Sequence, residues 1–347
     1  MDDIHIRIEG RAGRITLTRP KALNALSYEM CLAIDAALIA WAQDDRVALV
    51  LIDAEGDKAF CAGGDIAEMY ATGTRGDYSY GRRFWRDEYR MNARIADYPK
   101  PVVSFLHGFT MGGGVGVGCH ASHRIVGESS QIAMPECGIG LLPDVGGTYL
   151  LARAPGQLGA YLGLTGARMG PADAIRAGFA DLFLPEADWT EAKAALTATG
   201  QITALTGTAP PQGQFADLAA VIDDAFGQTT LAAIAERLAP QDTAFAQKAR
   251  AALQRNAPLS MACTLAILQQ GRVPTIRQAL TQEYRFTWRA MAQGDFLEGI
   301  RAAIIDKDKS PRWQHDSLAA VTEAEVAAML APLGANELNF EGEEITP

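Results

Sequence analysis

Residues 101–116 have the sequence PVVSFLHGFTMGGGVG, in which an apolar run of strand length leads into a glycine-rich stretch. An apolar run of this length, bounded by turn signals, is typical of a strand buried on both faces of a parallel sheet. The glycines at 112–116 predict a turn with close backbone approach, followed by the start of a helix. The longer run of 102–121 would suit a membrane span, but its six glycines and two histidines favour a buried strand, turn and helix start.

The same order of strand, glycine loop and helix occurs upstream. Residues 47–52 are continuously apolar and precede a glycine pair at 63–64, and residues 14–18 alternate in polarity like a half-buried strand. Apolar positions of 27–43 recur every three or four residues behind Ser27, a good N-cap, which predicts an amphipathic helix. Repeated units of this kind predict an α/β fold with a mainly parallel sheet.

The length of the chain indicates more than one packing unit, because 347 residues exceed the size at which a single core usually stops growing. After about residue 190 the sequence becomes alanine-rich and helical in pattern, and glycines and prolines interrupt it at 207–213. We therefore predict an α/β domain over residues 1–195, a helical C-terminal module over 214–335 and a frayed acidic tail over 336–347.

Composition narrows the classes of partner and compartment. The net charge of -10 argues against a nucleic-acid-binding surface, which needs a basic footprint. The N-terminal residues, MDDI, match neither a secretory signal nor a basic transit sequence, so we expect no export, no membrane partner and a cytoplasmic location. The cysteines form no CxxC pair, which favours reduced thiols; they are Cys31, Cys61, Cys119, Cys137 and Cys263.

Two glycine loops, Gly63-Gly64 and 112–114, follow neighbouring predicted strands. Each loop alone is equally compatible with a structural turn. The second is neither a phosphate-binding P-loop nor a dinucleotide fingerprint, because the required lysine and acidic residue are missing. As a pair, the loops predict two backbone N–H donors aimed at one carbonyl oxygen, which is the geometry of an oxyanion hole.

Acidic residues stand out in the stretch MPECGIGLLPDVGGT at 134–148. Glu136 and Asp144 lie among apolar residues and glycines, where burial would raise their pKa values and suit them to proton transfer. A purely structural interpretation, in which Glu136 begins a helix and Asp144 begins a turn, stays open on these residues alone. Glu88, in the segment RDEY, would by itself be interpreted as a solvated helix charge.

In this order, the motifs between about Ile15 and Pro185 resemble the crotonase (enoyl-CoA hydratase/isomerase) superfamily. The resemblance implies a crotonase-like ββα-superhelix core, and an oxyanion hole formed by the N–H groups of Gly64 and Gly113. It implies an acyl-CoA substrate, no separate cofactor or metal, and a possible homo-oligomer, a trimer or a pair of trimers. The residues that it implies for coenzyme A binding are Ala22, Leu23, Ala25, Ala62, Gly63, Asp65 and Ile66.

Within the superfamily, the acidic positions resemble those of 3-hydroxyisobutyryl-CoA hydrolases. Family hydratases carry a glutamate where this chain has Gly116, so only one of their two acid–base partners, Glu136, remains. Glu88, Asp144 and the stretch 295–313 resemble hydrolase positions. This implies hydrolysis of a short 3-hydroxyacyl-CoA in valine degradation, with Glu136 and Asp144 catalytic and the substrate bound by both of them together with Glu88 and Gly113. Cys137 departs from the threonine common in these hydrolases.

Several alternatives remain beside this interpretation. An enoyl-CoA hydratase or a dienoyl-CoA isomerase of the same superfamily is the main competitor, and a non-catalytic relative is a third. No GxSxG motif is present to indicate a serine hydrolase. We interpret Cys119, His120 and His123 as core packing rather than a metal site, because no second ligand pair accompanies them.

Overall fold

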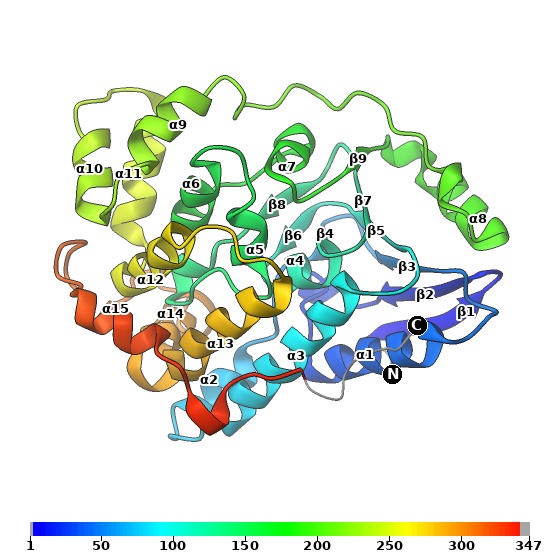
Figure 1. Cartoon of the computed structure of the whole chain (residues 1–347), viewed down its shortest axis with the longest axis horizontal. Coiled ribbons are helices and arrows are strands. Elements are labelled where there is room, and N and C mark those ends of the chain that lie inside the picture. The colour runs from blue at the N-terminus through cyan, green and yellow to red at the C-terminus, as the bar shows by residue number, and fades with distance from the viewer. Residues whose placement is uncertain (1–2, 341–347) are drawn as a thin grey trace.

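The computed structural model describes residues 3–340 and contains a six-stranded sheet, which lies in the right-hand half of Figure 1. The strand order is β1-β2-β3-β5-β7-β9. The strands pair in parallel except β1 and β2, which form an antiparallel pair at one edge, so the predicted mainly parallel sheet is confirmed. Their bounds are β1 Ile4–Glu9, β2 Ala12–Leu17, β3 Leu49–Ala54, β5 Val102–Leu106, β7 His123–Val126 and β9 Leu182–Phe183.

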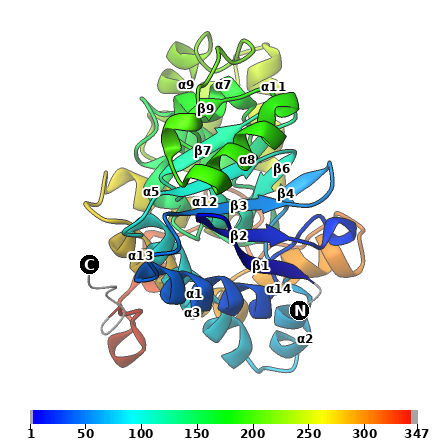
Figure 2. The same ribbon diagram turned by 90° about the vertical axis from the view of Figure 1, so that its right-hand side faces the viewer.

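The two faces of this sheet are covered by different helices. Leu49, Leu51 and Phe105 pack with Trp189 of α8 (Trp189–Thr199) in one apolar cluster. The alternate residues of the same strands belong to the main core, which also holds the buried face of α1 (Tyr28–Ala42). Figure 2 shows α8 and α1 on opposite sides of the sheet. Burial on both faces explains why β3 and β5 are apolar except at Asp53 and Ser104.

A second, three-stranded parallel sheet has the order β4-β6-β8. Its strands are β4 Ala59–Cys61, β6 Phe109–Met111 and β8 Gln131–Ala133. The glycine loops therefore end neighbouring strands, as predicted, but these are short strands of a second sheet rather than β3 and β5. Since carboxyl ends of parallel strands share one edge, the two loops and Glu136 are brought to one place.

Helices of the first half surround these sheets. Ser27 caps α1 as predicted, because its Oγ accepts a hydrogen bond from Met30 N at 3.2 Å. The glycine-rich stretch begins helix α4, as expected. The remaining bounds are α2 Ala67–Gly73, α3 Ser79–Ala96, α4 Gly113–Gly118, α5 Gly147–Leu151, α6 Leu158–Thr165 and α7 Pro171–Ala177.

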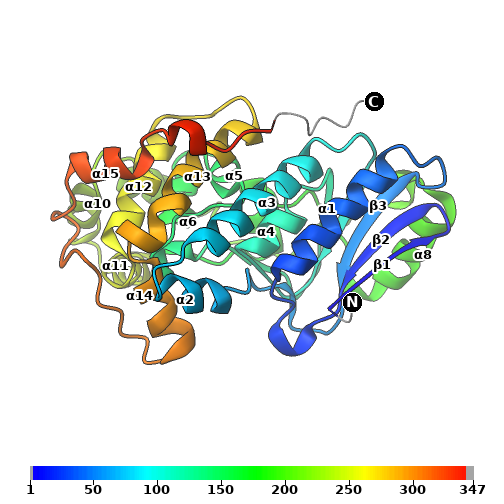
Figure 3. The same cartoon turned by 90° about the horizontal axis from the view of Figure 1, so that it is seen from below.

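Within the described residues, the chain after β9 contains helices and no strand. Helix α12 packs on α6, and α13 packs along α3, where Figure 3 shows the two side by side. One apolar cluster joins both halves, and the division into domains stays a prediction. Residues 341–347 of the predicted tail lie outside the described residues. The bounds are α9 Ala219–Phe226, α10 Leu231–Leu238, α11 Ala244–Arg255, α12 Pro258–Gln269, α13 Ile276–Gln293, α14 Phe296–Ile300, a π-helical turn Arg301–Ile305 and α15 Glu323–Leu330.

Candidate active site

A cavity of about 240 Å³ opens where the three strands of the second sheet end. Both glycine loops and all three predicted acids line it. Two larger hollows lack both a glycine-loop pair and an acid cluster: one of about 500 Å³ between residues 151–160 and the C-terminal helices, and one of about 620 Å³ among the C-terminal helices. The apolar wall of the cavity consists of Met69, Phe84, Trp85, Met111, Ile139, Leu141, Val145, Phe296 and Ile304.

The two glycine loops touch each other at the cavity. A Cβ on Gly113 would lie 3.2 Å from Gly64 N and 3.1 Å from Glu88 Oε1, so a larger residue there would crowd both groups. Gly63 and Gly112 have φ values of 122° and 49°, which favour glycine. Neither Gly64 N nor Gly113 N has an acceptor among residues 3–340. Two donors without partners on one small cavity fit the predicted oxyanion hole.

Glu136 follows β8 at the start of a 3-10 turn, Glu136–Ile139. The side chain is buried, and its Oε2 has no hydrogen-bond partner among the described residues. Its Oε1 lies 2.9 Å from the position of a Cβ on Gly112, which places the carboxyl group against the oxyanion loop. Burial first, and then the neighbouring Asp144, raises the pKa of Glu136 well above its usual value.

Glu88 and Asp144 complete the acid cluster. Glu88 is 4% exposed, and its Oε1 also lacks a partner within residues 3–340, so the solvated-helix interpretation is wrong. Burial and then Asp144 raise the pKa of Glu88 well above its usual value. Asp144 Oδ2 accepts a hydrogen bond from the Tyr89 hydroxyl at 2.7 Å, and burial raises the pKa of Asp144 to about 7. None of the three acids has an ion-pair partner in the described part of the chain.

The position of Gly116 is closed to a larger side chain. A Cβ on Gly116 would lie 2.7 Å from Asn92 Nδ2 and 2.9 Å from Val145 Cβ. Asn92 is fully buried, and neither polar atom of its amide has a partner in the described structure. The chain therefore lacks not only the glutamate that hydratases carry at this position but also the space for one.

The residues predicted to bind coenzyme A fall into two groups. Ala62, Gly63 and Ile66 line the cavity. Asp65 is held beside it by an ion pair with Arg19 at 3.0 Å. The others, Ala22, Leu23 and Ala25, lie on the adjacent segment outside the cavity lining, where Ala62 N donates a hydrogen bond to Leu23 O at 3.0 Å.

The remaining polar residues of interest are engaged in packing. His120 Nε2 donates to Val145 O at 2.8 Å, and burial lowers the pKa of His120 to about 4, so its ring is neutral. His123 Nδ1 lies 2.9 Å from Ser122 Oγ. Cys137 Sγ lies 3.5 Å from Thr264 Oγ1 of α12, not at an acid of the cluster. Over residues 3–340, no group of three His, Cys, Asp or Glu side chains is arranged to hold a metal.

Sequence reasoning missed two residues behind the cluster, Tyr89 and Glu283. Tyr89 follows Glu88 on α3 and reaches Asp144. Glu283 lies on α13, on the stripe of buried residues that includes Leu280 and Phe286. A carboxylate on the apolar face of a helix was the signal that could have identified Glu283.

Comparison with known proteins gives consistent results over nearly the whole chain. A family model described as enoyl-CoA hydratase/isomerase matches residues 12–330. A mitochondrial 3-hydroxyisobutyryl-CoA hydrolase of Gallus gallus is 37% identical, covering 97% of this chain and 91% of the relative. The human protein of the same name is 36% identical, covering 98% of this chain and 91% of the relative.

Solved structures are also similar. A crystal structure described as an enoyl-CoA hydratase from Rhodobacter sphaeroides 2.4.1 is 61% identical, with a TM-score of 0.96, and covers 97% of this chain and 100% of the other. One described as a carnitinyl-CoA dehydratase from Mycobacterium thermoresistibile is 41% identical, with a TM-score of 0.94, and covers 99% and 100%. The fold, the paired glycine loops and these matches agree, and the chain belongs to the enoyl-CoA hydratase/isomerase family.

Proposed function

We propose that this protein hydrolyses a short 3-hydroxyacyl-CoA thioester, most specifically 3-hydroxyisobutyryl-CoA, to 3-hydroxyisobutyrate and coenzyme A, a step of valine degradation. The observation that carries the proposal is the cluster of Glu88, Glu136 and Asp144 beside two unpartnered backbone donors, with no room for an acid at Gly116. Curated relatives that match over nearly the full chain bear the name of this hydrolase.

In this proposal the acyl carbonyl oxygen accepts hydrogen bonds from Gly64 N and Gly113 N. These donors stabilise the negative charge that develops on that oxygen when the carbonyl is attacked. In the direct route, a water oxygen bonds to the acyl carbon, the carbon–sulfur bond breaks, and the proton taken up by Glu136 passes to the coenzyme A sulfur. In the covalent route, a Glu136 oxygen bonds to the acyl carbon, the carbon–sulfur bond breaks, and the coenzyme A thiolate leaves and takes a proton from solvent. Water then opens the mixed anhydride and releases the acid and Glu136. Burial and the neighbouring Asp144 raise the pKa of Glu136, which makes its carboxylate a stronger base toward the attacking water.

Only the covalent route can place the oxygen of water in Glu136. Single turnover in heavy-oxygen water, followed by mass analysis of the Glu136 peptide, tests for this route. Label in the peptide excludes a pure general base, whereas label confined to the released acid fits direct attack and also an anhydride opened at the acyl carbon.

The 3-hydroxyl group would be bound by Glu88 and Asp144. Glu88 Oε1 is buried without a partner, and such a group gains most from a ligand that supplies one. A site that hydrogen-bonds a hydroxyl rejects the analogue lacking it, because the buried polar groups are then left unpaired. The cavity of about 240 Å³ and its aromatic wall suit a short acyl group rather than a long chain.

Enoyl-CoA hydration is the second candidate, because the Rhodobacter sphaeroides structure with 61% identity is described as a hydratase. Water addition to an alkene requires two acid–base partners, and the position where hydratases of the family carry the second is Gly116, where Asn92 and Val145 fill the space. The test is a thioester panel in which thiol release and alkene loss are followed in parallel. Thiol release from 3-hydroxyisobutyryl-CoA supports hydrolysis, whereas fast loss of the crotonyl-CoA alkene without thiol release would support hydration.

The assembly and compartment belong to the same proposal. We expect a trimer or a pair of trimers from the family resemblance, which light scattering of the purified chain would test. All five cysteines are free and buried, as a reducing, cytoplasmic location would require, whereas the names of the curated relatives place those proteins in mitochondria. Among the described helices, none is both long and apolar enough to cross a bilayer.

A further inference from the structure

The turn that carries Asp144 has an unfavourable backbone conformation. Val145 has a φ of 52°, which is uncommon for a β-branched residue, and Gly146 follows with a φ of 80°. Gly147 N donates to Asp144 O at 2.6 Å and closes the turn. A conformation of this kind persists only when the surrounding contacts hold it.

Glu283 supplies three of these contacts. Its Oε2 accepts a hydrogen bond from Gly146 N at 2.8 Å, and its Oε1 accepts one from Thr148 N at 2.9 Å. The Thr148 hydroxyl is also hydrogen-bonded to Glu283 Oε1. Gly146 is the N-cap of α5 and offers no side chain to cap it, so Glu283 satisfies N–H groups that the helix leaves open. The Glu283 side chain is fully buried.

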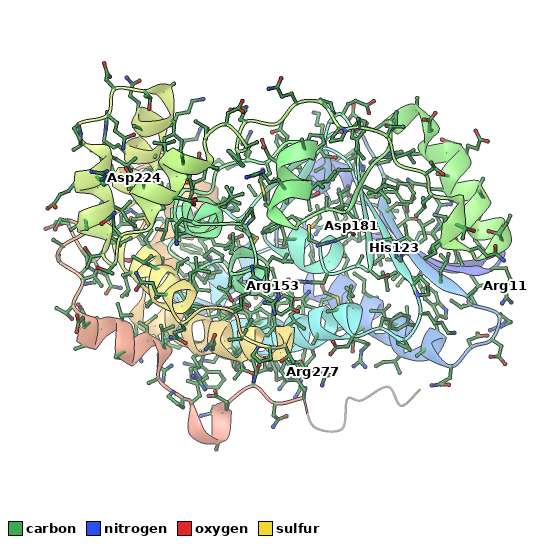
Figure 4. The ribbon with its side chains drawn as sticks, turned by 45° about the horizontal axis from the view of Figure 1, so that its top comes forward. Arg11, His123, Arg153, Asp181, Asp224 and Arg277 are labelled. Atoms are coloured by element: carbon green, nitrogen blue, oxygen red, sulfur yellow. The ribbon has the colours of Figure 1, made fainter. Side chains whose placement is uncertain are left out.

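Helix α13 is itself anchored to both sides of the site. Arg153 Nη2 donates to Val273 O at 2.7 Å, just before α13 begins, and Arg277 Nε lies 2.9 Å from Asp97 Oδ2 at the end of α3. Figure 4 shows Arg153 and Arg277 near the α13 part of the molecule. One turn beyond Glu283, Thr287 Oγ1 lies 3.4 Å from the Tyr89 hydroxyl oxygen.

Tyr89 of α3 links helix α13 to the side chain of Asp144. Its hydroxyl donates to Asp144 Oδ2 at 2.7 Å, and its ring packs edge-on against Tyr284, with centroids 6.0 Å apart. The backbone and the carboxylate of Asp144 are therefore both held by groups that depend on α13.

We propose that Glu283 is a positioning residue that fixes the Asp144 turn, so that the C-terminal helices set the selectivity of the site for the acyl hydroxyl group. This rests on the proposed function, because it assigns Asp144 a role in binding the substrate. Glu283 does not line the cavity, and its hydrogen bonds are to the turn.

The test substitution is Glu283→Gln, which keeps size but turns one N–H-accepting oxygen into an amide donor. An amide donor facing Gly146 N or Thr148 N leaves a buried N–H unpaired. We expect kcat/KM for 3-hydroxyisobutyryl-CoA to fall about ten- to a hundredfold. The preference over isobutyryl-CoA should fall with it, because a loosened Asp144 no longer holds the hydroxyl group.

Asp173 offers a matched control. It is a buried carboxylate on α7 that accepts hydrogen bonds from Gln214 N at 3.0 Å and Phe215 N at 2.9 Å, and it lies outside the cavity. Asp173→Asn also replaces a buried carboxylate oxygen that accepts backbone N–H groups with an amide donor. It should lower stability comparably while leaving kcat and the preference between the two thioesters unchanged.

A double-mutant cycle with Asp144→Ala decides whether Glu283 acts through Asp144. It is run on the thioester that the unmodified enzyme cleaves fastest. We expect Glu283→Gln to cost little further kcat/KM once Asp144 is gone, since the two residues belong to one unit. Additive losses in the cycle, or an unchanged preference in Glu283→Gln, would overturn the proposal.

Two outcomes keep this test separate from the proposed function. If the unmodified enzyme does not release thiol from 3-hydroxyisobutyryl-CoA, the proposed function fails whatever Glu283 does. If Glu283→Gln does not fold, Thr148→Val removes one partner of Glu283 and leaves its two N–H contacts. That variant should show a smaller loss of preference in the same direction, and a full preference in a folded Thr148→Val enzyme would contradict the role of the turn.

Discussion

Asp53 on the large sheet and Glu136 in the cavity are both buried carboxyl groups, but their surroundings differ. Asp53 lies 2.7 Å from Arg14 and 3.0 Å from Lys193. Burial acts to raise the pKa of Asp53, but Lys193 and Arg14 outweigh it and hold that pKa below its usual value. Among residues 3–340, Glu136 has no such cation, and the nearby groups that shift its pKa further upward are two acids, Asp144 and then Glu283.

This difference in surroundings distinguishes Asp53, a structural carboxylate, from Glu136, a carboxyl group that can take part in catalysis. A buried carboxylate with cations on its oxygens is satisfied and has no reason to bind a ligand. Buried acids that raise each other's pKa values and keep oxygens without partners are unfavourable for stability, and such groups cluster at functional sites. Glu283 is intermediate, because it is buried without a cation but backbone donors satisfy it.

Removing the acid function of Glu136 should give the largest effect. Glu136→Gln keeps the shape of the side chain but cannot accept a proton or attack the thioester. We expect kcat to fall at least about a hundredfold, while the affinity for coenzyme A stays nearly unchanged. Steady-state kinetics and calorimetric titration with coenzyme A measure the two quantities. A Glu136→Gln enzyme with full activity would contradict the assignment.

The second prediction concerns Gly116, beside the acid cluster, where there is little space for a side chain. Gly116→Glu should not produce crotonyl-CoA hydration, because Asn92 and Val145 occupy the position that its side chain would enter. Gly116→Ala should already lower the free energy of unfolding by about 1–3 kcal/mol through overpacking. Gly170→Ala is the control, since a Cβ there meets nothing within 4 Å. Urea unfolding compares the two alanine variants, and rapid hydration by Gly116→Glu would show that the space is available.

Removing a cation from Asp53, the structural acid, should lower the stability of the protein but not its activity. Lys193→Met removes one cation from Asp53 but leaves Arg14 and the Thr16 hydroxyl in contact with it. We expect a loss of about 1–2 kcal/mol in the free energy of unfolding, the range for a buried polar group that loses a partner. Activity measured at a temperature where the variant is folded should not change. A large fall in kcat would mean that the two acid regions are coupled.

The smallest effect is the pH dependence of stability. Burial raises the pKa of Asp144 to about 7 and that of Glu283 to about 8, so folding favours their protonated forms. Their contribution to stability is complete below the usual carboxyl pKa and is lost as pH rises through about 7 to 8. The melting temperature should therefore decline between pH 5 and 9, and less so in Asp144→Asn. If the melting temperature declined equally in the unmodified protein and in Asp144→Asn, Asp144 would not contribute to the decline.

The elements that could be predicted from the sequence are those with a signal among neighbouring residues. Apolar runs identified β3 and β5, and helical spacing with Ser27 identified α1, because these signals are local. Strand β1, with the sequence IHIRIE, was missed although its apolar and polar residues alternate, as in a half-buried strand. The strands of the second sheet have three residues each, too few for periodicity to show.

In the site too, the residues that could be predicted are those in local sequence motifs. The glycine loops and Glu136 lie in distinctive local motifs. Glu88 was interpreted as a surface charge without the family resemblance, although it lies on the buried face of α3 with Phe84 and Trp85, a signal like that of Glu283. Glu283 contacts Gly146 across 137 positions of sequence, so only the folded chain shows what it holds.

The central claim is that the unpartnered acids bind the 3-hydroxyl group of the substrate. Its most direct test is kcat/KM for 3-hydroxyisobutyryl-CoA against isobutyryl-CoA, measured on the unmodified enzyme and on Glu88→Ala and Asp144→Ala. We predict a preference for the hydroxylated thioester of up to about four orders of magnitude, which shrinks sharply in both variants. Equal kcat/KM values for the two thioesters in the unmodified enzyme would contradict the claim and leave only membership of the family.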